Sequence, residues 1–207
     1  MQNKFASAQA CIKRLIGYAL KLIIEPGEFF RTMPKSGGIQ EPLVYIILTV
    51  WLDVFLIAIE TFIKHGVGTY NLSILLGSLI LFPLIVVILS FFVGGIFYAA
   101  WLFMGSQENY ETSYRCMAFM QILVPITILL SLFSYMGLLG IAWWLYLMVV
   151  ATKIVHKLPI KHALIVFGCI AAISALIYYS SVSSSIKTNE HLQEFTDGLQ
   201  RMPSNSR

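Results

Sequence analysis

Residues 72–104 read LSILLGSLILFPLIVVILSFFVGGIFYAAWLFM and contain no charged side chain. A helix needs about 20 mostly apolar residues to cross a bilayer, because the hydrocarbon layer is roughly 30 Å thick. The stretch is too long for one upright helix and too short for two helices joined by a turn. It therefore predicts a single over-length or tilted membrane helix, bent near Pro83 because proline lacks a backbone N–H.

Four further apolar blocks surround this one, at residues 43–63, 117–133, 138–155 and 163–179. The chain is 58% hydrophobic and only 12% charged, with a mean hydropathy of +0.79, so a soluble domain of this size could not bury its apolar surface. The alternating segments of a membrane β-barrel are absent from the sequence. The expected fold is all-α, an integral membrane bundle of five transmembrane helices.

The sequence divides into four regions. Residues 1–24 carry apolar side chains at helical spacing with lysines and an arginine between them, which predicts a basic amphipathic helix in the headgroup layer. An ordinary helix packed on the bundle is the alternative. Residues 25–42 form a connector rich in proline and glycine, residues 43–180 the five-span domain, and residues 181–207 a polar tail that is frayed outside a short helix near 190–199.

The basic residues are unevenly distributed. If the N-terminus is cytoplasmic, ten of the 14 lysines and arginines fall on the cytoplasmic side, as membrane proteins prefer. We therefore expect a cell-membrane protein with a cytoplasmic N-terminus, a C-terminus on the opposite side and anionic lipid rather than nucleic acid as partner. The side chains expected to contact lipid at this interface are Lys13, Arg14, Lys21, Phe29, Phe30, Lys153, Lys157 and Lys161.

Two acids in the first span are candidates for function. Asp53 and Glu60 are seven residues apart and share one helix face, about 10 Å apart along the axis. An ionisable side chain within a span faces protein or water and is a functional candidate by default. Asp53 is either a polar clamp or a site, with Gln121 among its expected partners, whereas Glu60 could simply reach water beside Lys64.

Glycines and prolines mark the expected kinks and helix contacts. Small residues let membrane helices approach closely, so we expect packing at Gly94 and Gly95. Pro83 and Pro125 interrupt the second and third spans.

No recognisable catalytic motif occurs in the sequence. Nucleophile elbows, zinc-protease helices, paired cysteines and phosphate-binding loops are all absent, and His156 with His162 makes a poor metal site without a nearby acid or thiolate. We therefore expect a protein that is not an enzyme and needs neither a metal nor a cofactor.

Several short segments, in order, resemble the Yip (Ypt/Rab-interacting protein) domain family of multi-pass membrane proteins. The resemblance covers about residues 20–180, and these segments are EPGEFFRTM at 25–33, Gly37-Gly38, Glu41-Pro42-Leu43, Tyr114-Arg115, Ala118-Phe119, Pro125, the stretch 140–144, His156, Leu158, Lys161 and Ala163. It implies a five-helix membrane protein with a cytosolic N-terminus. Eukaryotic relatives act in vesicle traffic and recruit small GTPases.

The chain lacks the long acidic extension of those relatives and is more similar to a prokaryotic member, so we do not expect small GTPase binding. The favoured function is a non-enzymatic membrane scaffold or adaptor, in membrane organisation or trafficking-like processes, that forms homo- or hetero-oligomers. The alternatives are a small-solute or ion transporter or channel that uses Asp53 and Glu60, and a lipid scramblase.

Overall fold

The computed structural model describes residues 2–65 and 72–200, with side chains described for residues 13–64, 77 and 79–188. Every element within these residues is helical. The helices are α1 (Gln2–Ile24), α2 (Pro26–Thr32), α3 (Gln40–His65), α4 (Leu72–Phe103), α5 (Tyr110–Met120), α6 (Leu123–Ser131), the short 3₁₀ helix Ser134–Met136, α7 (Gly137–Ile154) and α8 (Ile160–Gln200).

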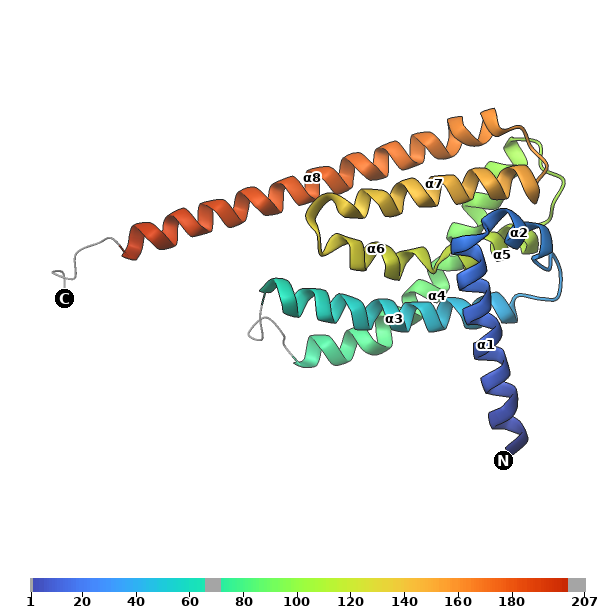
Figure 1. Cartoon of the computed structure of the whole chain (residues 1–207), viewed down its shortest axis with the longest axis horizontal. Coiled ribbons are helices and arrows are strands. Elements are labelled where there is room, and N and C mark those ends of the chain that lie inside the picture. Colours follow the sequence, from blue (N-terminus) through green and yellow to red (C-terminus); the bar gives the residue numbers. More distant parts are fainter. Residues whose placement is uncertain (1, 66–71, 201–207) are drawn as a thin grey trace.

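Within the described residues, five helical segments are long and apolar enough to cross a membrane, which confirms the predicted all-α membrane fold. They are Gln40–Lys64, Leu79–Phe103, Tyr110–Ser131, Ser134–Ile154 and Ile160–Thr188. The spans α3, α6, α7 and α8 run side by side, and α4 crosses behind them (Figure 1). The second span is one unbroken helix that contains Pro83.

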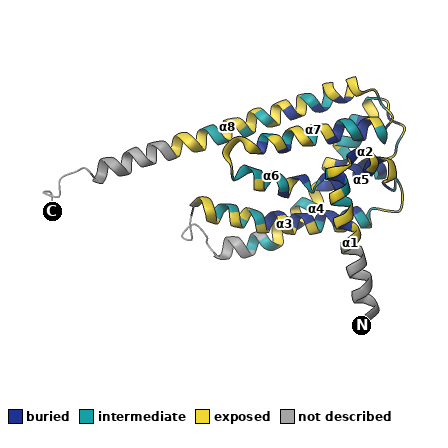
Figure 2. Ribbon diagram, viewed as in Figure 1, coloured by how far each residue is buried: buried dark blue, intermediate teal, exposed yellow. Residues whose placement is uncertain are grey.

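The bundle has two unlike ends. The connector end carries α1, α2 and the loops at 33–39, 104–109 and 155–159, whereas the hairpin end carries the turn from α6 to α7. Buried residues are concentrated around α2 and α5 at the connector end, and α8 is largely exposed over residues 160–188 (Figure 2). The protein core therefore lies toward the connector end, and much of the remaining span surface is apolar and exposed, as lipid contact requires.

The third span is two helices rather than one. Pro125 has no backbone N–H to give to the Gln121 carbonyl, and Val124 N–H donates to that oxygen instead, at 3.0 Å. Gln121 N–H likewise donates to Ala118 O at 3.2 Å, so both bonds are of the tighter 3₁₀ type. The break at residues 121–122 separates α5 from α6 and places the polar Gln121 in the middle of the span.

The C-terminal region differs from the prediction. We expected a polar tail from residue 181, but α8 continues without interruption to Gln200. At 1.5 Å per residue its 41 residues span about 60 Å, roughly twice the hydrocarbon thickness, so α8 projects beyond the hairpin end (Figure 1). Serine and threonine hydroxyls that bond back to the preceding turn, such as Ser185 to Ser181 O at 3.0 Å, satisfy polar groups within this helix. Residues 201–207 of the predicted tail lie outside the described residues.

Candidate functional site

The first turn of α5 begins the polar centre of the molecule. The predicted third span begins at residue 117, but α5 already starts at Tyr110, because Asn109 caps it. The Asn109 side chain accepts a hydrogen bond from Thr112 N–H at 2.9 Å, and Glu111 places negative charge in the first turn. The cap therefore places Arg115 on the helix α5, where its side chain faces the protein.

Arg115 is only 1% exposed and holds the connector against α5. Its Nη2 donates to Gly38 O at 2.7 Å, while Nη1 lies 3.5 Å from Glu41 and Nε lies 3.4 Å from Glu111. Gly38 N–H donates in turn to Glu111 Oε1 at 2.7 Å. Gly37 has φ +127° and approaches Arg115 so closely that an added Cβ would lie 3.2 Å from Nη2. Gly38 has φ +86°, so both positions favour glycine.

Glu41 connects this network to α1. One oxygen faces Arg115 on α5, and the other lies 2.9 Å from Nη2 of Arg14. Burial and the Glu41 carboxylate raise the pKa of the hydroxyl of Tyr18, which lies on α1 like Arg14. One carboxylate at the start of α3 therefore joins α1, α3 and α5.

A second polar cluster closes the connector end between α4 and α7. Lys35 lies 2.5 Å from Glu108 and donates to Val155 O at 3.3 Å. His156 is 4% exposed, stacks on Trp101 with ring centroids 4.0 Å apart and shares a 2.8 Å hydrogen bond with Ser106. Burial lowers the pKa of His156 to about 4, so the imidazole is neutral at pH 7.

Phe29 and Phe30 correct one prediction. We expected them to be wedged against lipid, but they are 2% and 1% exposed and lie inside the protein. Phe29 packs edge-on against Tyr18 and Phe119, with centroids 6.0 and 5.6 Å away. The short helix α2 turns both rings inward, so they anchor α1 and α2 to the bundle rather than to the membrane.

The predicted basic residues gather at the connector end. Lys13, Lys153, Lys157 and Lys161 are all exposed. Arg14 is exposed but paired with Glu41, and Lys21 donates to Thr32 Oγ1 at 3.1 Å. Lys4, which also belongs to the predicted basic helix, lies outside the residues whose side chains are described. The lysines and the arginine that were predicted to contact lipid therefore lie at the connector end of the spans.

Asp53 lies in the interior of the first span. It is 2% exposed, its carboxyl is within hydrogen-bonding reach of the Gln121 side chain, and its Oδ1 is buried without a hydrogen-bond partner. The α5–α6 break therefore supplies the polar partner that the sequence pattern pointed to. A buried carboxyl with an unpaired oxygen can accept a proton or a hydrogen bond from a bound group.

Glu60 has a different environment. It lies 2.6 Å from Lys64, one helical turn later, and accepts a 2.8 Å hydrogen bond from Ser131 Oγ on α6. Glu60 and Lys64 line a crevice at the hairpin end with a volume of about 770 Å³. Asp53 and Glu60 share a helix face, but the structure gives them separate partners, so they do not form one site.

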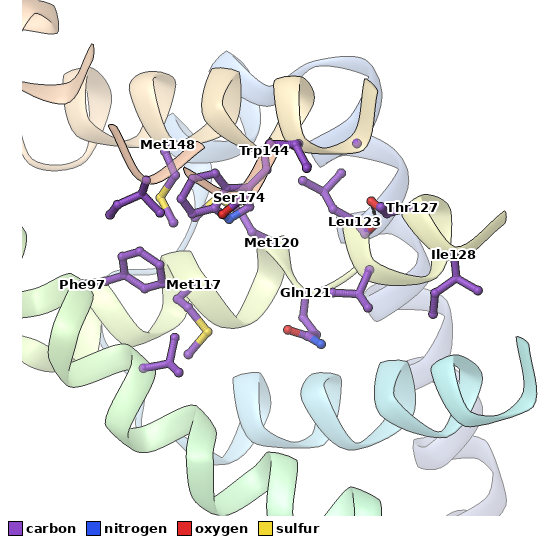
Figure 3. Close-up of a pocket in the computed structure, with 15 residues that line it drawn as sticks. Phe97, Met117, Met120, Gln121, Leu123, Thr127, Ile128, Trp144, Met148 and Ser174 are labelled. Atoms are coloured by element: carbon purple, nitrogen blue, oxygen red, sulfur yellow. Dashed lines mark hydrogen bonds between the residues drawn. The ribbon is translucent and has the colours of Figure 1, made fainter. Parts of the chain in front are cut away.

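A mostly apolar cavity of about 440 Å³ lies beside the α5–α6 break. Its walls come from α4, α5, α6, α7 and α8, and Phe97, Met117, Met120 and Trp144 turn toward it in Figure 3. Gln121 is at its edge, and its amide points toward α3 (Figure 3). Phe97 packs near Trp144 and Phe167, both with centroids about 6 Å away, and this cluster closes the cavity toward the connector end.

The predicted packing residues have unequal roles. Gly94 is buried against α5, and an added Cβ would lie 2.8 Å from Cδ2 of Tyr114. Gly95 has open space where a Cβ would be. Pro83 and Pro125 are both buried, and only Pro125 coincides with a break in the helix. Close helix approach in this region therefore depends on Gly94.

Several central residues escaped prediction. Arg115 and Glu41 were named only within the segments that resemble the Yip family, and His156 only there and as part of a poor metal site. One signal was available: Asn109 followed by an acid at Glu111 is typical of a helix start, which would have moved Arg115 into the third span. The pairing of Arg115 with Glu41 depends on residues 74 positions apart and had no local signal.

Among the described residues, no group of three or more histidines, cysteines or acids is close enough to hold a metal ion. In comparisons with known proteins, the family model described as the Yip1 domain matches residues 20–182, which is most of the chain. No curated protein and no solved structure matches the chain.

Proposed function

The chain belongs to the Yip1 domain family of membrane proteins, and from that premise we propose that it is a non-enzymatic membrane scaffold. It would organise protein partners and lipid from its connector end. The observation that carries this proposal is the position of α1, which lies crosswise to the spans instead of parallel to them (Figure 1).

The exposed face of α1 supports contact with lipid. Its buried face, with Leu15 and Leu22, packs on the bundle. Ile16, Leu20 and Ile24 follow at four-residue steps and remain 54%, 54% and 72% exposed. An uncovered apolar stripe on a helix at the end of a membrane bundle suits the headgroup layer, where Lys13 and Lys21 would meet lipid phosphate. The cytoplasmic orientation of this end and a cell-membrane location are part of the proposal.

The test uses vesicles and a matched pair of variants. Leu20→Ser removes one residue of the stripe without changing the α1 anchor, and Ile173→Ser makes a similar change on the lipid-facing side of α8. Reconstituted parent protein should alter the shape of anionic vesicles, seen by electron microscopy, and Leu20→Ser should reduce this while Ile173→Ser does not. Equal activity in both variants would contradict a role for α1.

Crosslinking in native membranes, followed by mass spectrometry, would identify neighbouring proteins.

The observation that favours a second function is the unpaired oxygen of Asp53 beside Gln121. A small transporter or channel would use this carboxyl in the interior of the span, since intramembrane acids mark ion and proton paths. Flux of protons or cations into sealed vesicles, abolished in Asp53→Asn, would support it. Vesicles that remain tight with the parent protein would dismiss it.

A further inference from the structure

The apolar cavity and the polar crevice lie one after the other along the same two helices. On α8, Ile170 and Ser174 line the cavity, and Tyr178 and Ser181 line the crevice. Steps of three or four residues keep these side chains on one helix face. On α6, Ile128 belongs to the cavity and Ser131, three residues later, to the crevice. The two hollows therefore form a row that runs from the membrane interior toward the hairpin end.

The apolar cavity suits hydrocarbon rather than water. Its lining is dominated by aliphatic, aromatic and methionine side chains, and the Thr127 hydroxyl already donates to Leu123 O at 2.8 Å. A buried water needs two to four polar partners, and an unfilled cavity costs stability in proportion to its volume. Because a methylene is about the size of a water molecule, near 30 Å³ in the liquid, 440 Å³ holds on the order of 15 of them.

The polar crevice suits a headgroup. It presents a cation and an anion together, since Lys64 lies 2.6 Å from Glu60 and retains 43% exposure of its side chain. Hydroxyl groups of α8 line the opposite wall, at Ser181, Ser184, Ser185 and Thr188. A phosphate next to an ammonium group matches this pattern, because Lys64 and the hydroxyls of Ser181 and Ser184 can donate to phosphate and Glu60 can accept from the ammonium.

We propose that one zwitterionic phospholipid lies along α6 and α8, with an acyl chain in the cavity and its headgroup in the crevice. The head then points to the hairpin end and the chain to the membrane interior, as in a bilayer leaflet. This site goes beyond the scaffold function, which depends on α1 at the other end of the spans, so either proposal can fail alone.

The acyl-chain half is tested by a photoactivatable phosphatidylethanolamine with a diazirine in its acyl chain, in nanodiscs that hold the full chain. Crosslinked peptides should contain α6 and the cavity-facing part of α8. Ser174→Trp fills the cavity and should lower the crosslink yield about five- to tenfold, equivalent to about 1 to 1.4 kcal/mol. Ile173→Trp, at the neighbouring 58% exposed position, should match the parent. Should Ser174→Trp fail to fold, Ser174→Leu replaces it with a smaller filling group.

The headgroup half is tested by native mass spectrometry of protein taken from vesicles with equal amounts of phosphatidylethanolamine and phosphatidylglycerol. The parent should retain phosphatidylethanolamine in preference, and Lys64→Gln and Glu60→Gln should each lose the retained lipid severalfold. Lys187→Gln, on an exposed part of α8 outside the crevice, is the control. A free fatty-acid probe that labels the cavity equally well would overturn the headgroup assignment. Equal labelling of the parent and both Ser174 variants would overturn the site as a whole.

Discussion

At the connector end, the charged and aromatic side chains that hold the helices together are buried, whereas at the hairpin end the helices meet through small residues and more exposed polar contacts. Arg115, Glu41 and His156 are buried in contacts that cross between elements at the first end. At the second, an added Cβ on Gly140 would lie 2.9 Å from Cβ of Thr127, so α6 and α7 nearly touch. The difference fits the surroundings, because polar groups next to the headgroup layer can be satisfied, while packing of small residues drives association within lipid.

The two ends also differ in how closely their parts are packed. The connector end is where α1 and α2 meet the spans, and its loops are held by side-chain hydrogen bonds. The crevice at the hairpin end is larger than the interior cavity and opens beside exposed parts of α8. The connector end therefore presents a surface held by hydrogen bonds, and the hairpin end presents a surface with a crevice that a partner or lipid could enter.

The largest effect should come from breaking the Arg115 network. Arg115→Ala leaves Glu41 and Glu111 without their shared cation and releases Gly38 O, so we expect the free energy of unfolding to fall by about 3 kcal/mol. Arg31→Ala, which removes a 69% exposed side chain paired only at 3.8 Å, should change it by less than about 0.5 kcal/mol. Denaturant titration in mixed micelles measures both. Similar values for the two variants would show that the buried network does not hold the connector end together.

Acidic pH should weaken the same end through His156. Its pKa is about 4 in the folded protein and about 6.5 when unfolded, so the unfolded state binds the proton first as pH falls. The stability that neutral His156 provides is complete above pH 6.5 and is lost as pH falls toward 4. Between pH 7.5 and pH 5 we expect a loss of about 2 kcal/mol.

Unfolding at these two pH values checks the His156 prediction. His156→Gln should remove most of the pH dependence in this range. Glu108 and Lys35 face the same cluster, so Glu108→Gln, which leaves His156 in place, is the control. An equal pH dependence in the parent and His156→Gln would assign the effect to other groups.

Adjacent glycines in α4 test whether close packing is local. Gly94→Ala forces a methyl group to 2.8 Å from the ring of Tyr114, which is itself stacked on Phe91 at 5.2 Å, so the ring has little freedom to move. We expect a loss of about 1.5 kcal/mol. Gly95→Ala meets open space and should stabilise the helix by about 0.5 kcal/mol. Thermal unfolding of the pair checks the sign, and a change of the same sign in both would contradict the packing.

The smallest effect should be at the hairpin end. Lys64→Ala removes an ion pair that is 43% exposed at the lysine, so stability should fall by only about 0.5 kcal/mol. The contrast with Arg115→Ala is the sharpest measure of how the two ends differ. A loss comparable to that of Arg115→Ala would mean that the hairpin end is as tightly held as the connector end.

The number of spans was predictable because it depends on local composition. Each apolar block carries its own signal, and the structure differs mainly in where helices begin and end, as at Tyr110 and at the long extension of α8. Phe29 and Phe30 show the limit of that reasoning. An apolar ring next to a membrane segment is stable both against lipid and inside the protein. Only the packing of Tyr18 and Phe119 around Phe29 shows that this ring lies inside the protein.

By itself the sequence determined that this protein lies in lipid, that it has five membrane-spanning segments and that positive charge clusters near one set of span ends. These properties follow from the length of apolar blocks and from the placement of charged residues, which can both be read from contiguous stretches of chain. Only the tertiary structure decided that Arg115 is enclosed, that Asp53 meets Gln121 while Glu60 does not, and that Gly94 rather than Gly95 bears a helix contact. Those outcomes depend on which side chains from distant segments come to lie within a few ångströms, and no short stretch of chain encodes that distance.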